Sequence, residues 1–245
     1  MSQNLEEATL PPVEGPNKSM VQRIVGVLFS PKSTFEDINR KPDWLIPLIL
    51  IVLVTLAATY VFMSHADIME LLRAQIEKSG RTPPPDEALA GSAKYAVIFS
   101  YISIIVFVPV GTLVVAGVLF MIFSFIMGAE TTYKKMFSVT VYASITGVVR
   151  SLIAIPILFT KQPTEFGNPA DVVQSNLGFL FDPAQKALHA LGKSLDIFTV
   201  WYIVVMSIGI AAISKGMAQT KALVALIILW ILVICAVVGW AAWRG

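Results

Sequence analysis

The sequence predicts an all-α fold: a polytopic membrane helix bundle with five transmembrane helices and short amphipathic helices at the membrane interface. Hydrophobic residues make up 56% of the 245-residue chain and charged residues only 14%, whereas soluble domains carry roughly 25% charged residues. The mean hydropathy is +0.75. Five apolar stretches reach the length of about 18 residues that a membrane-spanning helix needs.

The expected spans follow one another along most of the chain. They cover residues 44–63, 95–127, 137–160, 196–213 and 222–243. The second is longer than one perpendicular crossing needs, so we expect it to tilt or to begin outside the hydrocarbon. Pro109 and Gly111 within it are typical of a kink. Together the spans define a transmembrane domain over residues 44–243.

Ahead of the spans, the chain divides into a tail and a pair of short helices. Residues 1–19 contain prolines and glycine with little apolar surface to bury, so we expect a disordered cytosolic tail. Apolar residues at helical spacing over 20–29 predict a first amphipathic helix, and Ser33 with Glu36 predicts a capping box that begins a second. Residues 20–43 thus form an interfacial segment. Two placements stay open for it: on the surface of an anionic cytoplasmic leaflet, or packed under the bundle.

Lysine and arginine residues predict the orientation. Basic residues of the interfacial segment are expected to face anionic lipid, namely Arg23, Lys32, Arg40 and Lys41. The short second and fourth loops are basic as well, with Lys134, Lys135, Lys215 and Lys221. This density places the N-terminus in the cytoplasm and the C-terminus outside. The two longer outer loops are expected to carry surface helices over 67–80 and 181–192.

Arg150 is a full charge inside the third expected span, where an uncompensated charge costs several kcal/mol. On a helix, Tyr142, Thr146 and Arg150 share one side, opposite the stripe of large apolar residues, so they point into the bundle. Asp196 begins the next span at the same membrane face and is the expected partner of Arg150. We favour a structural ion pair between the third and fourth spans. The alternative is a polar chamber, formed by these four residues, that meets an anionic ligand or lipid headgroup.

Several short motifs occur in a fixed order along the chain. They are Ser30-Pro31 with Phe35, the Pro42, Trp44 and Pro47 spacing, Gly128 with Tyr133-Lys134-Lys135, and Tyr142-Ala143. In this order, over roughly residues 20–243, the chain resembles the Yip-one domain family of Ypt/Rab-interacting membrane proteins. The stretch 195–210 is similar to the fourth span of the prokaryotic branch, and the "DLxGP"-type motif of the eukaryotic branch is absent. The resemblance implies a multi-pass protein of a prokaryotic cytoplasmic membrane, with roles in membrane organisation or trafficking-like partner binding.

The sequence argues against several classes of function. It has no GxSxG or HExxH motif, no glycine-rich phosphate loop and no close pair of carboxylates inside the spans, so we predict neither an enzyme nor a bound metal or cofactor. A net charge of +2 is too small to indicate nucleic-acid binding. We therefore predict a non-catalytic membrane scaffold or adaptor.

Its expected contacts are the lipid bilayer, including anionic lipids, and protein partners that bind the N-terminal segment. The sequence leaves open whether the chain forms a homo-oligomer. The alternative function is a small-solute or ion transporter or channel that uses the polar chamber around Arg150 and Asp196.

Overall fold

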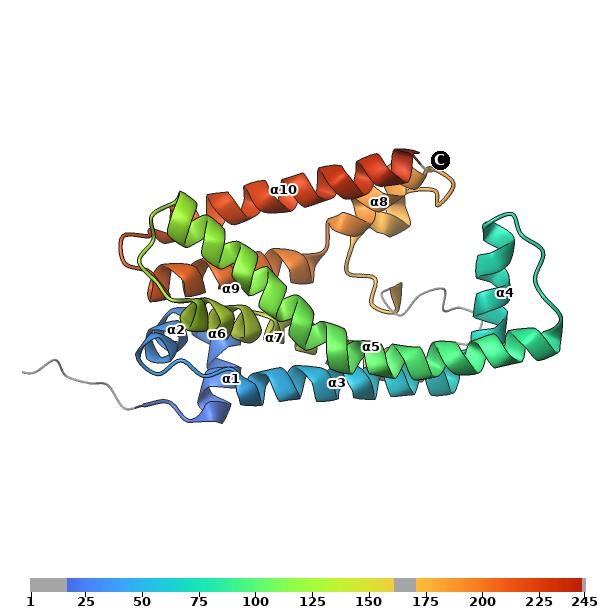
Figure 1. Ribbon diagram of the computed structural model, residues 1–245, viewed down its shortest axis with the longest axis horizontal. Coiled ribbons are helices and arrows are strands. Elements are labelled where there is room, and N and C mark those ends of the chain that lie inside the picture. The colour runs from blue at the N-terminus through green and yellow to red at the C-terminus, as the bar shows by residue number, and fades with distance from the viewer. Residues whose placement is uncertain (1–16, 161–170, 244–245) are drawn as a thin grey trace, which may run out of the picture.

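Helices joined by turns and loops, with two isolated β-bridges, make up residues 17–160 and 171–243, the part of the chain that the computed structural model describes (Figure 1). The first helices are α1 (Met20–Phe29), α2 (Pro31–Arg40), α3 (Leu45–His65), α4 (Ile68–Lys78) and α5 (Asp86–Phe120), which continues into a π-helical turn, η1 (Met121–Ile126). They are followed by α6 (Tyr133–Ala143), α7 (Ile145–Leu158), a short 3-10 turn η4 (Leu177–Leu180), α8 (Lys186–Ser194), α9 (Ile197–Ile213) and α10 (Gln219–Trp243). The all-α prediction is confirmed for these residues. The predicted tail falls mostly on residues 1–16, outside the described residues.

Four helical segments of the described chain are long and apolar enough to cross a membrane. They are α3, α5 with η1, α6 with α7, and α10. The fifth expected span corresponds to α9, which has 17 residues. It packs against α10, α2 and α6 (Figure 1). Multiple membrane crossings are therefore supported, while the count of five stays a prediction because α9 is short.

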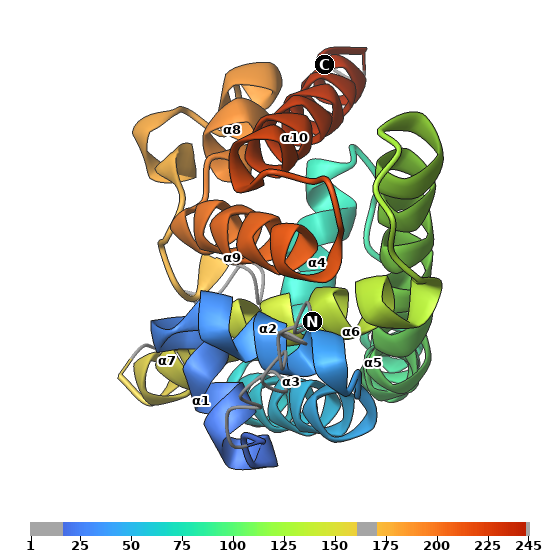
Figure 2. The ribbon, with the colours of Figure 1, turned by 90° about the vertical axis from the view of Figure 1, so that its left-hand side faces the viewer.

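The bundle has two ends, and each collects a different set of short segments. In Figure 1, α3 and α10 follow the long axis, and α1, α2 and the turns 127–132 and 214–218 gather at one end, which we call the N-terminal end. The helices α4 and α8 lie at the opposite end (Figure 1). An isolated β-bridge between Glu130 and Lys215 joins the two turns at the N-terminal end. Seen from that end, α2 lies across the bundle in front of α6 (Figure 2).

The core is centred on α6, whose residues from Met136 to Ala143 are all buried. Helix α2 contributes Phe35 and Ile38 to this core, both fully buried. Helices α2 and α6 approach α9 closely at Gly209. A β-carbon at this position would lie 2.5 Å from Val139 Cγ1 and 3.1 Å from the Phe35 ring. Helix α2 is therefore an integral part of the fold, because only a glycine at position 209 leaves space for the Phe35 ring.

Three local expectations need correction. The capping box lies at the start of α1, where Ser19 and Gln22 cap each other, and not at Ser33. Helix α2 begins at Pro31 because proline suits the first helical turn, and the Ser33 hydroxyl donates back to the Ser30 carbonyl. The third expected span is interrupted at Ser144, which separates α6 from α7.

Candidate functional site at the N-terminal end

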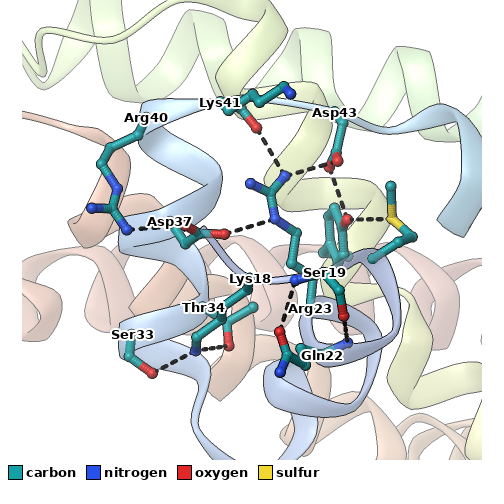
Figure 3. Close-up of polar contacts among 12 residues, drawn as sticks. Lys18, Ser19, Gln22, Arg23, Ser33, Thr34, Asp37, Arg40, Lys41 and Asp43 are labelled. Carbon is teal, nitrogen blue, oxygen red and sulfur yellow. Dashed lines mark hydrogen bonds and ion pairs between the residues drawn. The ribbon is translucent and has the colours of Figure 1, made fainter. Parts of the chain in front are cut away.

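A charged cluster is buried where α1 and α2 meet the bundle (Figure 3). Arg23 on α1 is only 3% exposed because it shares the inner face of the helix with Gly26 and Val27. Its Nε donates to Asp37 Oδ2 at 2.8 Å, and its Nη1 donates to Asp43 Oδ2 at 2.8 Å. These contacts compensate an arginine that would otherwise be costly to bury.

The cluster also includes backbone and aromatic partners. Arg23 Nη1 donates to the Lys41 carbonyl at 2.9 Å. The Tyr142 hydroxyl, from α6, donates to Asp43 Oδ1 at 2.8 Å. We call Arg23, Asp37, Asp43 and Tyr142 the Arg23 cluster. It joins four segments: α1, α2, the linker that leads into α3, and α6.

Electrostatics keep Arg23 and Asp37 ionised. Burial tends to raise the pKa of Asp37, but the hydrogen bond and charge of Arg23 outweigh it, so the pKa lies below its ordinary value. Burial likewise tends to lower the pKa of Arg23, and Asp43 and Asp37 reverse that effect and raise it. Asp37 Oδ1 also accepts a hydrogen bond from Arg40 at 3.0 Å. At neutral pH the hairpin of α1 and α2 is therefore attached to the bundle by charge-assisted hydrogen bonds.

Arg150 and Asp196 lie near each other at a second place, between α7 and the start of α9. The distance from Arg150 Nη1 to Asp196 Oδ2 is 4.0 Å, longer than a direct hydrogen bond. Asp196 is the N-cap of α9 and accepts the backbone N–H groups of Phe198 at 2.9 Å and Thr199 at 3.1 Å. It also accepts the Ser175 hydroxyl. Most of the acceptor capacity of this carboxylate thus serves the start of α9 and the chain before it.

Tyr142 and the Arg150–Asp196 pair, expected around one polar chamber, have side-chain contacts at two different places. Arg150 lines a cavity of about 230 Å³ together with residues of α3 and α7, including Thr55, Thr59 and Ser151. Tyr142 belongs instead to the Arg23 cluster. Thr146 is buried and donates to the Ala143 carbonyl at 3.0 Å, as a helical threonine commonly does. Any function of the Arg150 and Asp196 pair stays a prediction.

Comparison with known proteins identifies the family. The Yip1 domain matches residues 25–240. The chain belongs to the Yip1 domain family. A relative from Bacillus subtilis (strain 168), described as membrane protein YknW, is 25% identical over 204 residues, which cover 82% of this chain and 84% of the relative. No solved structure matches the chain.

The Yip1 domain therefore supports the multi-pass membrane prediction and the resemblance drawn from the motif order. The structure explains several residues of these motifs by the contacts that they make. Phe35 fills the space over Gly209, and Tyr142 binds Asp43. Trp44 packs its ring against Phe137 of α6, with centroids 5.2 Å apart. These residues all fix the N-terminal hairpin and the start of α3 to α6.

Sequence reasoning missed Asp37 and Asp43 and misplaced Arg23 in this Yip1 domain protein. Arg23 was expected to face lipid headgroups, but it is buried, because two carboxylates within reach make the interior less costly than it would be for a lone cation. Part of the signal was present: Arg23 falls at helical spacing from Met20 and Val27, on the apolar face of the first helix. Asp37 gave no such signal, because it does not share a helix face with Phe35 and Ile38, and only the structure shows that it is buried. Lys32, Arg40 and Lys41 are exposed, as expected for interfacial residues.

A pair of variants separates the capping role of Asp196 in the Yip1 domain from its charge. Asparagine also caps helices well, so we expect Asp196→Asn to cost less than about 1 kcal/mol of unfolding free energy. Asp196→Ala removes every acceptor and should cost about 2 kcal/mol or more. Unfolding in detergent micelles, followed by circular dichroism, measures both. Equal losses for the two variants would show that the charge opposite Arg150 matters more than the cap.

Proposed function

We propose that this Yip1 domain protein is a non-catalytic membrane scaffold or adaptor whose α1–α2 hairpin recruits a protein partner to the membrane. The observation that carries the proposal is the Arg23 cluster. It attaches the hairpin to both α3 and α6, so the outer side of α2 has a fixed position relative to the spans. A surface with a fixed position binds a partner with little entropy lost to ordering.

The exposed basic residues of the α2 segment support a partner whose binding surface is acidic. Lys32, in the first turn of α2, and Lys41, directly after its last residue, are both exposed. The basic excess is complementary to acidic side chains and would speed their association. The density of lysine and arginine at this end of the bundle also supports a cytoplasmic location, where soluble partners are accessible.

Separation of the predicted chamber residues supports a scaffold over a transporter. A transport path needs polar groups that line one continuous route near the middle of the membrane. Tyr142 donates to Asp43 at the N-terminal end, whereas Arg150 lies near Asp196 at the start of α9. The two groups stabilise different helix junctions.

Co-purification from native membranes tests the proposal. The full chain is compared with the double variant Lys32→Glu/Lys41→Glu, which reverses the charge of the α2 surface and leaves the side chains of the Arg23 cluster in place. The matched control is Arg81→Glu, an exposed change at the opposite end. After photo-crosslinking at equal membrane levels, we expect one enriched protein to be lost from the double variant and retained by the control. An unchanged profile, or no enriched protein at all, would overturn the proposal.

A further inference from the structure

Helix α1 has the reverse of the usual polarity for a surface helix. Its charged residue, Arg23, faces the core, while Val21, Val25 and Phe29 are 69%, 50% and 81% exposed. These three residues stand four positions apart and therefore form one continuous apolar strip, which we call the α1 strip. A strip of large apolar side chains along an entire helix indicates contact with something other than water.

The position of α1 indicates what that contact is. In Figures 1 and 2, α1 runs across the long axis of the bundle, which α3 and α10 follow. Because α3 and α10 are membrane-spanning candidates, α1 lies roughly in the membrane plane at the N-terminal end. The first turns of α3, at the same end, expose Leu45, Ile46 and Ile49. An in-plane helix with one apolar side beside a lipid-facing span is typical of the boundary between headgroups and acyl chains.

A groove of about 980 Å³ lies between the α1 strip and α2. Its walls carry two cations, Lys18 and Arg40, and hydrogen-bonding groups such as Gln22. Lys18 Nζ donates to the hydroxyls of Ser33 at 2.8 Å and Thr34 at 2.9 Å (Figure 3). These neutral acceptors fix the position of the ammonium group without cancelling its charge.

The other charged residues of the groove restrict which class of ligand it can bind. Arg40 is 44% exposed and shares Asp37 with the buried Arg23, so its outer N–H groups can still meet an anion. Glu36 also lines the groove, and its carboxylate accepts hydrogen bonds but repels a bare anion. A phosphate diester with a hydroxyl-bearing headgroup suits all of these groups together.

We propose that this groove binds an anionic phospholipid of the phosphatidylglycerol type. The phosphate lies between Lys18 and Arg40, the headgroup hydroxyls donate to Glu36, and the acyl chains cover the α1 strip. This places α1 within the leaflet at the N-terminal end. The inference does not rest on a protein partner, since Lys32 and Lys41, the basic residues of the proposed partner surface, do not line this groove.

Spin-label depth measurement tests the position of α1. The full chain carries Cys235→Ala, which removes its single cysteine, and one nitroxide at Val25→Cys or, as the matched aqueous control, at Lys32→Cys. In nanodiscs that contain phosphatidylglycerol, we expect the label at position 25 to collide with oxygen and to be shielded from a water-soluble nickel chelate. Free access of the chelate to that label would overturn the proposal. Shielding from both reagents would also overturn it, because a protein segment, from a partner or from residues 1–16, would then cover the strip.

Lipid retention tests the selectivity of the groove independently. Protein purified in mild detergent is offered mixed phosphatidylglycerol and phosphatidylcholine, and bound lipid is counted by native mass spectrometry. We expect Lys18→Gln/Arg40→Gln to reduce the preference for phosphatidylglycerol roughly tenfold, since each cation near a membrane surface contributes measurably to anionic lipid binding. The control Lys215→Gln/Lys221→Gln removes two exposed cations of the same end outside the groove. An equal reduction by the control would show general charge attraction and would overturn a specific site.

Discussion

Replacing Arg23 with leucine is expected to destabilise the chain by about 3–5 kcal/mol, the usual cost of removing one partner of a buried ion pair. The reason is the charge left behind. Asp37 is 1% exposed and would keep only Arg40 as a cationic partner, while Asp43 would keep the Tyr142 hydroxyl. Arg40→Gln is the matched control, because Arg40 also pairs with Asp37 but has a side chain that is 44% exposed. We expect this variant to lose less than about 1 kcal/mol of unfolding free energy.

The double variant Arg23→Leu/Asp37→Leu distinguishes the lost pair from the lost packing. Two apolar side chains need no compensation, so the double variant should recover at least half of the loss, with Asp43 left partly solvated at 29% exposure. Unfolding of each variant by sodium dodecyl sulfate in mixed micelles gives the free energies. No recovery in the double variant would show that Arg23 acts through its hydrogen bond to the Lys41 carbonyl and not through charge.

The pH dependence of the Arg23→Leu penalty has a defined sign. The pKa of Asp37 is lower in the folded chain than its ordinary value, so its contribution to stability is complete above about pH 4 and is lost as the pH falls through the folded-state pKa. Protonated Asp37 needs no cationic partner. Without Arg23, burial raises the pKa of Asp37 in the variant. The difference between the wild-type chain and Arg23→Leu should therefore be largest near neutral pH and shrink as the pH falls, beginning where the unpaired Asp37 of the variant is protonated.

The spans were predictable because a single property determines them. A long apolar helix satisfies its backbone hydrogen bonds internally and needs only length and hydropathy to be found. Length and hydropathy therefore predicted α3, α5 and α10, although the ends of these helices differ from those of the expected spans. Helix α9 shows the limit, because its Asp196 cap fixes where the helix begins and leaves 17 residues. A helix of that length lies at the lower edge of what spans a bilayer.

The polar sites were less predictable because they depend on which helices meet. Helical spacing predicts Arg150 on an inward side and chain direction predicts Asp196 as its partner, and their charged groups lie 4.0 Å apart in the structure. The same reasoning put Tyr142 with Arg150, since both lie on one side of a continuous helix. In the structure, Ser144 separates α6 from α7. Asp43, from the linker before α3, accepts the Tyr142 hydroxyl, so Tyr142 has its partner in the Arg23 cluster. Contacts between segments distant in sequence leave little trace in a single sequence without variation to compare.

The second large effect is expected at Phe35. This ring is fully buried between α6 and α9, above Gly209, and truncation of such a residue to alanine typically costs about 3–5 kcal/mol because a cavity remains. Phe29→Ala is the matched control in the same hairpin, where the ring is 81% exposed, and we expect it to change the unfolding free energy by less than about 0.5 kcal/mol in micelles. A comparable loss at both positions would show that the hairpin does not pack on the bundle as described.

Phe35→Ala also shows whether the hairpin detaches as one unit. If the Arg23 cluster and the Phe35 contact are two attachments of the same hairpin, either change favours a state in which α1 and α2 leave the bundle while the spans stay folded. The double variant Arg23→Leu/Phe35→Ala should then cost clearly less than the sum of the single losses, because the second attachment is already broken. Maleimide labelling of Val27→Cys in the Cys235→Ala chain reports the same event, since Val27 is fully buried in the attached hairpin. Additive losses with a slow, unchanged labelling rate would instead place both residues in the global core, and the hairpin would unfold only with the spans.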